Sequence, residues 1–269
     1  MNNITFFTSS IDHDALLTED KTPNFSLQSR NLTERRRISL SDPKPTSLYT
    51  SSRYRSFSFD HLSSLVQDLF VAGTETISNT LDWAILSVTY FPGVQSRIFN
   101  EIDQVLGRER SPTESDRFKL PYIEAFISET MRYHCAGPIL VPKSTTCDVV
   151  FKGYQIPENT FVMVNMWSCM RDPLYWPEPG LFQPMRFIDE EGRFDSRNPA
   201  MMPFSVGKRA CTGEAVARLQ MFLIFTSLLQ KFSFTFSDER NYGKESLLRG
   251  IPGIGLYKSQ DVSLKLKLR

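Results

Sequence analysis

The sequence predicts a mainly α protein with a minor β region. Two observations support this class: long segments in which apolar residues recur at helical spacing, and short apolar runs bounded by glycine and proline. The helical segments are residues 60–90, 92–106, 120–134 and 212–230. The strands are expected at 139–165, 232–236 and 254–268, with an irregular, proline-rich stretch up to residue 203.

The first helix, residues 60–90, contains small residues in its interior, Ala72 and Gly73. A glycine within a helix lowers helix stability by roughly 1 kcal/mol relative to alanine, which suggests that Gly73 has a packing or functional role. Small side chains let a flat group and a small molecule lie against the helix backbone. Glu75 and Thr76 follow with an acid and an alcohol suited to relaying protons. The alternative is a core helix whose small residues contact a neighbouring helix.

The segment 120–134 begins at Leu120-Pro121, where a proline in the first turn is tolerated. Glu129 and Arg132 lie three residues apart, on one helix face. Arg186 lies in the irregular stretch, within F-x-P-x-R-F at residues 182–187. Taken singly, the Glu129–Arg132 spacing predicts a surface ion pair that contributes a few tenths of a kcal/mol.

The run F-S-V-G-K-R-A-C-T-G at residues 204–213 ends where the last long helical segment begins. Cys211 is therefore placed at a helix N-terminus, where free N–H groups and the helix dipole favour a thiolate. Gly207 and Gly213 leave room for a flat ligand to approach the backbone, and Arg209 can neutralise a carboxylate. These features suit a soft ligand to iron beside a carboxylated macrocycle. The alternative is a buried core cysteine.

The pattern F-x-x-G-x-R-x-C-x-G resembles the haem-ligand loop of the cytochrome P450 family and matches it at every fixed position. The A-G-x-E-T run at residues 72–76 resembles the oxygen-activating helix of that family, and E-x-x-R and F-x-P-x-R-F resemble two further family motifs. All four follow the family's order, over about residues 57–269, closest to the animal microsomal drug- and lipid-metabolising branch. The resemblance implies the C-terminal portion of the cytochrome P450 fold.

The resemblance also implies a role for each motif residue. Cys211 would be the axial ligand of haem iron, Phe204 would shield its sulfur, and Arg209 and Lys143 would pair with haem propionates. At this position the family more often has arginine or histidine. Lys143 keeps the positive charge but lacks the planar guanidinium of arginine. Other cofactor contacts would be Gly207, Gly213, Ala72 and Gly73. Glu129, Arg132 and Arg186 would lock together behind the haem in a structural role. Substrate contacts would be Phe70, Ile139, Leu140, Val141, Ile251 and Ile254.

The activity implied is monooxygenation of a lipophilic small molecule. The cofactor would be haem b, the oxidant O₂, and the electrons would come from NADPH through a flavoprotein reductase. Thr76, helped by Glu75, would steer protons to the distal oxygen. Two alternatives stay open. A haem-thiolate isomerase or dehydratase would need no O₂, although such enzymes commonly lack the acid–alcohol pair. A truncated fragment would be catalytically silent, and a full family member is nearly twice as long as these 269 residues.

The composition of the chain gives no support for nucleic-acid-binding or zinc-binding function. A formal net charge of +1 offers no electrostatic argument for nucleic-acid binding. The cysteines at 135, 147, 169 and 211 have no CxxC spacing, so a zinc site finds no support and a reducing compartment is the simpler inference. The three histidines are scattered, and His134 is expected to be a helix-end residue.

Residues 1–56 contain 17 serines and threonines and no glycine, and they show no sustained apolar period. We expect this segment to be disordered, and residues 57–269 to be the C-terminal part of a catalytic domain. The sequence has no run of about 20 apolar residues, which predicts no transmembrane helix in this chain. The resemblance implies the cytosolic face of the endoplasmic reticulum membrane, with a soluble, anchorless chain as the alternative.

Overall fold

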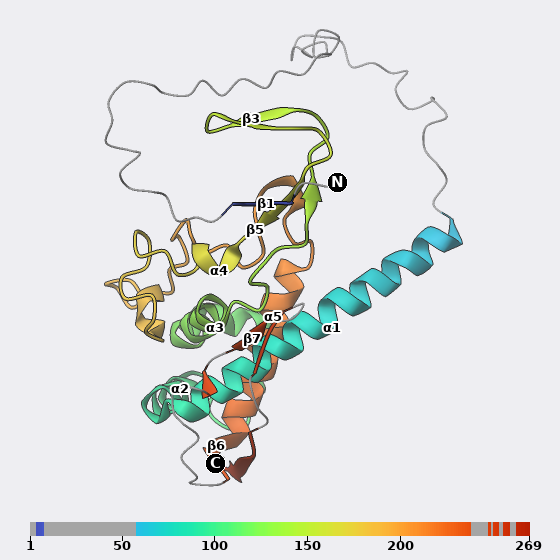
Figure 1. Cartoon of the computed structure of the whole chain (residues 1–269). Helices are drawn as coiled ribbons and strands as arrows, with labels where there is room; N and C mark the ends of the chain where they lie inside the picture. Colours follow the sequence, from blue (N-terminus) through green and yellow to red (C-terminus); the bar gives the residue numbers. More distant parts are fainter. Residues whose placement is uncertain (1–3, 8–57, 238–246, 249, 253–254, 259–261) are drawn as a thin grey trace, which may run out of the picture. The chain divides into compact units, whose positions relative to one another are not determined.

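The computed structural model describes residues 4–7, 58–237, 247–248, 250–252, 255–258 and 262–269 (Figure 1). The chain divides into two compact units. Unit 1 comprises residues 1–5, 12–71 and 142–162, and unit 2 comprises residues 6–11, 72–141 and 163–269. The prediction of a mainly α protein with a minor β region is confirmed. Apart from residues 4–7, the segment that we expected to be disordered lies outside the described residues.

The helices begin and end close to the residues that the apolar periodicity predicts. The α-helices are α1 (Phe59–Tyr90), α2 (Pro92–Val105), α3 (Pro121–His134), α4 (Met166–Cys169) and α5 (Glu214–Lys231). The 3₁₀ helices are η2 (Glu114–Lys119), η3 (Pro184–Phe187) and η4 (Gly207–Arg209). Proline occupies the first turn of α2, α3 and η3, where its missing N–H has no helical partner to lose.

The strands are short. They are β1 (Ile4–Phe7), β2 (Lys143–Ser144), β3 (Val149–Phe151), β4 (Tyr154–Ile156), β5 (Phe161–Val164), β6 (Phe232–Phe236), β7 (Gly250–Pro252), β8 (Leu256–Lys258) and β9 (Leu264–Leu268). One sheet has the order β1-β5-β2, and the pairs β3–β4, β6–β9 and β7–β8 are antiparallel ribbons. Among the described residues, none of the helices combines the length and apolarity needed to cross a membrane.

The core of unit 2 lies where α2, α3 and α5 pack on one another and on the C-terminal half of α1 (Figure 1). Phe126 of α3 and Phe225 of α5 stack with ring centroids 4.8 Å apart at its centre, and both are fully buried. The described N-terminal half of α1 contrasts with this, because residues 59–76 are all exposed. Burial of α1 therefore begins just after the segment that carries Glu75 and Thr76.

A buried histidine joins α1 to α3. The ring of His134 stacks on Trp83 with centroids 3.9 Å apart, and its Nε2 lies 2.9 Å from the Ser87 hydroxyl. Its Nδ1 is buried without a hydrogen-bond partner among the described residues. Burial lowers the pKa of His134 well below 6.5, and the positive charges of Arg171 and Arg132 lower it further. His134 is thus a neutral helix-end residue, which is the position that the sequence predicts.

This arrangement predicts acid sensitivity. Because the native pKa of His134 lies below the unfolded value of 6.5, the unfolded chain binds the proton first. The free energy of unfolding should therefore fall as the pH decreases below about 6.5, by up to ~1.4 kcal/mol per pH unit. His134→Gln should remove this part of the slope in urea unfolding between pH 5 and pH 8. His61→Gln, at an exposed histidine, is the control. Equal slopes in the wild type and His134→Gln would contradict the prediction.

Candidate functional site

The loop ahead of α5 is held by its own backbone. The N–H of Cys211 donates to the Phe204 carbonyl at 2.8 Å, and the N–H of Ala210 donates to the Gly207 carbonyl at 3.1 Å. Gly207 has a φ of +78°, a left-handed conformation that a side chain would strain. The loop thus returns on itself and brings Cys211 to the start of α5.

Cys211 has a free, exposed thiol. Gly213 is the N-cap of α5 and supplies no capping side chain, so the first N–H groups of this 18-residue helix have no side-chain cap. A Cβ at Gly213 would lie 3.8 Å from the Cys211 sulfur. Three features fit a haem-thiolate site. They are an accessible thiol, a neighbouring glycine without a side chain, and the positive N-terminal end of a helix.

Arg218 of α5 packs over the ring of Phe204, the first residue of the loop motif. The Phe204 ring packs against the core of unit 2, and the guanidinium of Arg218 lies 4.9 Å from its centroid. Glu214 holds Arg218 through a bond of 2.8 Å, one turn apart on α5. Arg218 was not among the site residues predicted from the sequence. The feature of the sequence that could have indicated it is the four-residue spacing of Glu214 and Arg218, which places an ion pair on one face of the helix that follows the loop. Arg209, in η4, is exposed.

The A-G-x-E-T segment lies on the exposed part of α1. Ala72, Gly73, Glu75 and Thr76 are all exposed, and nothing lies within 4 Å of a Cβ built at Gly73. The Thr76 hydroxyl donates to the Ala72 carbonyl at 2.7 Å. Ile77, the next residue, packs against the same core cluster as Phe204. One core therefore supports both the cysteine loop and the acid–alcohol segment.

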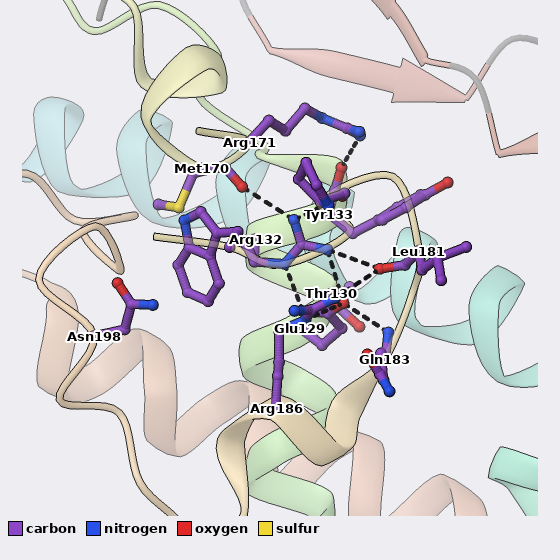
Figure 2. Close-up of polar contacts among 12 residues, drawn as sticks. Glu129, Thr130, Arg132, Tyr133, Met170, Arg171, Leu181, Gln183, Arg186 and Asn198 are labelled. Atoms are coloured by element: carbon purple, nitrogen blue, oxygen red, sulfur yellow. Dashed lines mark hydrogen bonds and ion pairs between the residues drawn. The ribbon is translucent and has the colours of Figure 1, made fainter. Parts of the chain in front are cut away.

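The structure brings Glu129, Arg132 and Arg186 together (Figure 2). The Glu129 carboxylate accepts two bonds from Arg132, at 2.6 and 2.8 Å, and one from Nε of Arg186 at 3.2 Å. Both Glu129 and Arg132 are fully buried, so the pair is not the surface pair that the spacing alone suggests. The cause is tertiary: η3 packs against α3 and covers it.

Arg132 and Glu129 also form hydrogen bonds with the backbone of the irregular stretch that follows α4. Arg132 donates to the carbonyls of Met170, Pro179 and Leu181, each at 3.0 Å. The N–H of Gln183 donates to Glu129 at 2.7 Å (Figure 2). The fork geometry of a guanidinium allows this many bonds from one side chain. A segment with little regular hydrogen bonding is thereby tied to α3.

The other predicted residues are distributed over both units. Phe70 and Lys143 are exposed residues of unit 1, and Lys143 begins β2, opposite Val162. In unit 2, Ile139 bridges Asn165, Leu140 is partly buried against Met166, and Val141 is exposed. Ile251 is an exposed residue of β7. Ile254 lies outside the described residues.

Comparison with known proteins identifies the family to which this chain belongs. Residues 28–255 match the family model described as Cytochrome P450. Cytochrome P450 2U1 of Rattus norvegicus is 41% identical over 182 residues, which are 68% of this chain and 34% of the relative. Cytochrome P450 2D20 of Mesocricetus auratus is 44% identical over 67% of this chain and 36% of the relative. Cytochrome P450 2J2 of Homo sapiens is 42% identical over 71% of this chain and 38% of the relative.

The chain belongs to the cytochrome P450 family, whose members form the haem-thiolate monooxygenase class. The family match begins at residue 28, before the start at about residue 57 that the motifs suggest. The chain spans about a third of the length of the relatives it matches.

Proposed function

We propose that this chain carries the iron-ligand loop and the proton-relay helix of a haem-thiolate monooxygenase. The reaction would insert one oxygen atom of O₂ into a lipophilic small molecule. The observation that supports the proposal best is the exposed thiol of Cys211 ahead of the N-terminus of α5, in the loop that packs on the same core as the Glu75–Thr76 segment.

Haem b, when bound, supplies an iron centre at which O₂ is activated, and a cysteine thiolate donates electron density that favours O–O cleavage. Cys211 would supply the thiolate that holds the iron, and the N-terminal end of the α5 dipole would stabilise the anionic sulfur. Arg209 and Lys143 would neutralise the propionates, and Phe204 would limit the access of water to the sulfur. Gly207, Gly213, Ala72 and Gly73 would leave the backbone open to the macrocycle.

Thr76 and Glu75 would move protons. The Thr76 hydroxyl keeps its hydrogen toward the Ala72 carbonyl, so its oxygen lone pairs remain available to accept a bond from a water or a neighbouring acid. The Glu75 carboxyl is exposed and adjoins Thr76 on the helix. Positioned acids and alcohols of this kind act as general acid–base catalysts.

Substrate class and location complete the proposal. Ile139, Val141 and Ile251 are exposed apolar side chains, and Phe70 is another, which favours lipophilic substrates. Leu140 and Ile254 would add to this set. Electrons would come from NADPH through a flavoprotein reductase. The site of action would be the cytosolic face of the endoplasmic reticulum membrane, in keeping with the resemblance to microsomal members of the family.

The proposal predicts that Thr76→Ala uncouples the reaction. With haem-loaded protein, an NADPH-dependent reductase and 7-ethoxycoumarin as a lipophilic probe, release of hydrogen peroxide relative to product should rise about tenfold or more. The physical reason is that the site loses the hydroxyl that would position and deliver the proton. Thr74→Ala, also exposed on α1 two residues earlier, is the matched control and should retain the wild-type ratio. An unchanged ratio in Thr76→Ala would remove Thr76 from this role.

A further inference from the structure

The chain directly ahead of β8 lies close to α1, one helical turn from the acid–alcohol segment. Gly255, which precedes β8, occupies a space in which a Cβ would be 2.7 Å from the Ala136 carbonyl oxygen and 3.3 Å from Nδ2 of Asn79. Asn79 lies one helical turn beyond Glu75, and thus on the same face of α1. Because no side chain fits at position 255, this glycine allows the chain ahead of β8 to lie against Ala136 and close to Asn79, on the helix face that also carries Glu75.

The approach brings Tyr257 to Glu75. The phenol of Tyr257 lies beside Gly255 and within hydrogen-bonding range of the Glu75 carboxylate. Partial burial raises the pKa of Tyr257, and the hydrogen bond to Glu75 and its negative charge raise it further. The phenol therefore keeps its proton across the neutral range, as a donor whose ring lies 3.6 Å from the position of a Cβ at Gly255.

The same ribbon carries a predicted substrate contact. Ile251 of β7 is directly opposite Tyr257 of β8 in the antiparallel register. Directly opposite residues of an antiparallel pair project from the same face of the ribbon. The Ile251 side chain is half exposed and available to a ligand. A ligand that shifts Ile251 would therefore act on the strand that holds Tyr257.

We propose that Tyr257 is a positioning residue for Glu75, which fixes the carboxylate beside Thr76 and ties its orientation to the substrate-contacting β7–β8 ribbon. Tyr257 keeps its own proton and acts only by donating a hydrogen bond. This inference rests on the proposed monooxygenase function for its consequence, whereas the Tyr257–Glu75 contact itself is independent of it.

The contact is tested first, on the protein without haem. Carbon-13 NMR of protein labelled at tyrosine Cζ follows the ionisation of each phenol, and Tyr257→Phe assigns the resonance. Glu75→Gln should lower the pKa of Tyr257, because the carboxylate charge that opposes phenolate formation is gone. Gly255→Ala should do the same by forcing the ribbon away from Ala136, whereas Gly180→Ala, where nothing lies within 4 Å, should leave it unchanged. A Tyr257 resonance that titrates identically in wild type and Glu75→Gln would overturn the proposal.

The positioning role is tested with haem-loaded protein, NADPH, reductase and 7-ethoxycoumarin. Tyr257→Phe should raise the ratio of hydrogen peroxide to product about three- to tenfold, as expected for one lost hydrogen bond, with KM for the probe unchanged. Tyr154→Phe, at an exposed tyrosine of β4, is the matched control. A Tyr257→Phe ratio equal to that of Tyr154→Phe would overturn the role.

Failure of the proposed function gives a different result. If Glu75→Gln and Thr76→Ala both leave the ratio at the wild-type value, the proton relay is wrong and the positioning role is overturned with it. The NMR result would then still report whether the Tyr257–Glu75 contact exists.

Discussion

We expect Cys211→Ala to abolish the absorption band that reduced, carbon-monoxide-bound protein shows when a thiolate is the axial ligand. Alanine offers no lone pair to iron, and the exposed Cys211 is the thiol that leads into α5. The measurement is the carbon-monoxide difference spectrum of the haem-loaded 269-residue chain. The same measurement is made on a chimaera in which residues 57–269 replace the matching part of rat cytochrome P450 2U1.

Cys147→Ala is the control for this experiment, since Cys147 is a partly exposed free thiol of unit 1. It should retain the full thiolate band. A thiolate band that persists in Cys211→Ala would show that another residue is the ligand. A wild-type protein that takes up no haem in either form would contradict the proposed function as a whole.

We expect Arg132→Met to cause the largest loss of stability. Among the described residues, the substitution leaves the buried Glu129 carboxylate with Arg186 as its charged partner, and it removes the bonds that Arg132 donates to three carbonyls. Removing one member of a buried ion pair costs about 3–5 kcal/mol, which is a large share of the ~5–15 kcal/mol that keeps a protein folded. Urea unfolding followed by circular dichroism measures the change.

Arg197→Ala is the matched control, because Arg197 also pairs with a carboxylate, Asp195 at 2.7 Å, but is 85% exposed. This pair should contribute about 0–1 kcal/mol. The double variant Glu129→Leu/Arg132→Met should recover only part of the loss, since the carbonyls of Met170 and Pro179 still lack the donor that Arg132 supplied. Equal losses for Arg132→Met and Arg197→Ala would contradict the view that burial of this cluster stabilises the fold.

Elements whose signal is local were predictable. The limits of α1, α2 and α3 follow from apolar periodicity and from Pro92 and Pro121, and β6 (Phe232–Phe236) coincides with the predicted strand. Local patterns suffice here because helical spacing and a first-turn proline act within a few residues. The cysteine loop was recognisable for the same reason, since its glycines and its cysteine are contiguous.

Contacts between distant segments were not predictable. The N-terminus of α3 is capped by Glu101 of α2, whose carboxylate accepts from the N–H groups of Tyr122 and Ile123 at 2.8 and 3.0 Å. Gln95 joins α1 to β6 through the Val88 carbonyl and the Phe234 N–H. Neither residue has a distinctive sequence signal, because a capping carboxylate or a bridging amide is defined by where its partners lie.

The amino-acid sequence by itself determined the fold class, the positions of the main helices, the family, and the residues around Cys211 and Glu75. Only the tertiary structure decided that Glu129 and Arg132 are buried, that Arg218 lies over Phe204, and that Gly255 lies against Ala136 and Asn79. The physical reason is that periodicity and motif spacing describe one segment at a time. Burial, charge pairing and close backbone approach depend on which second segment packs against the first.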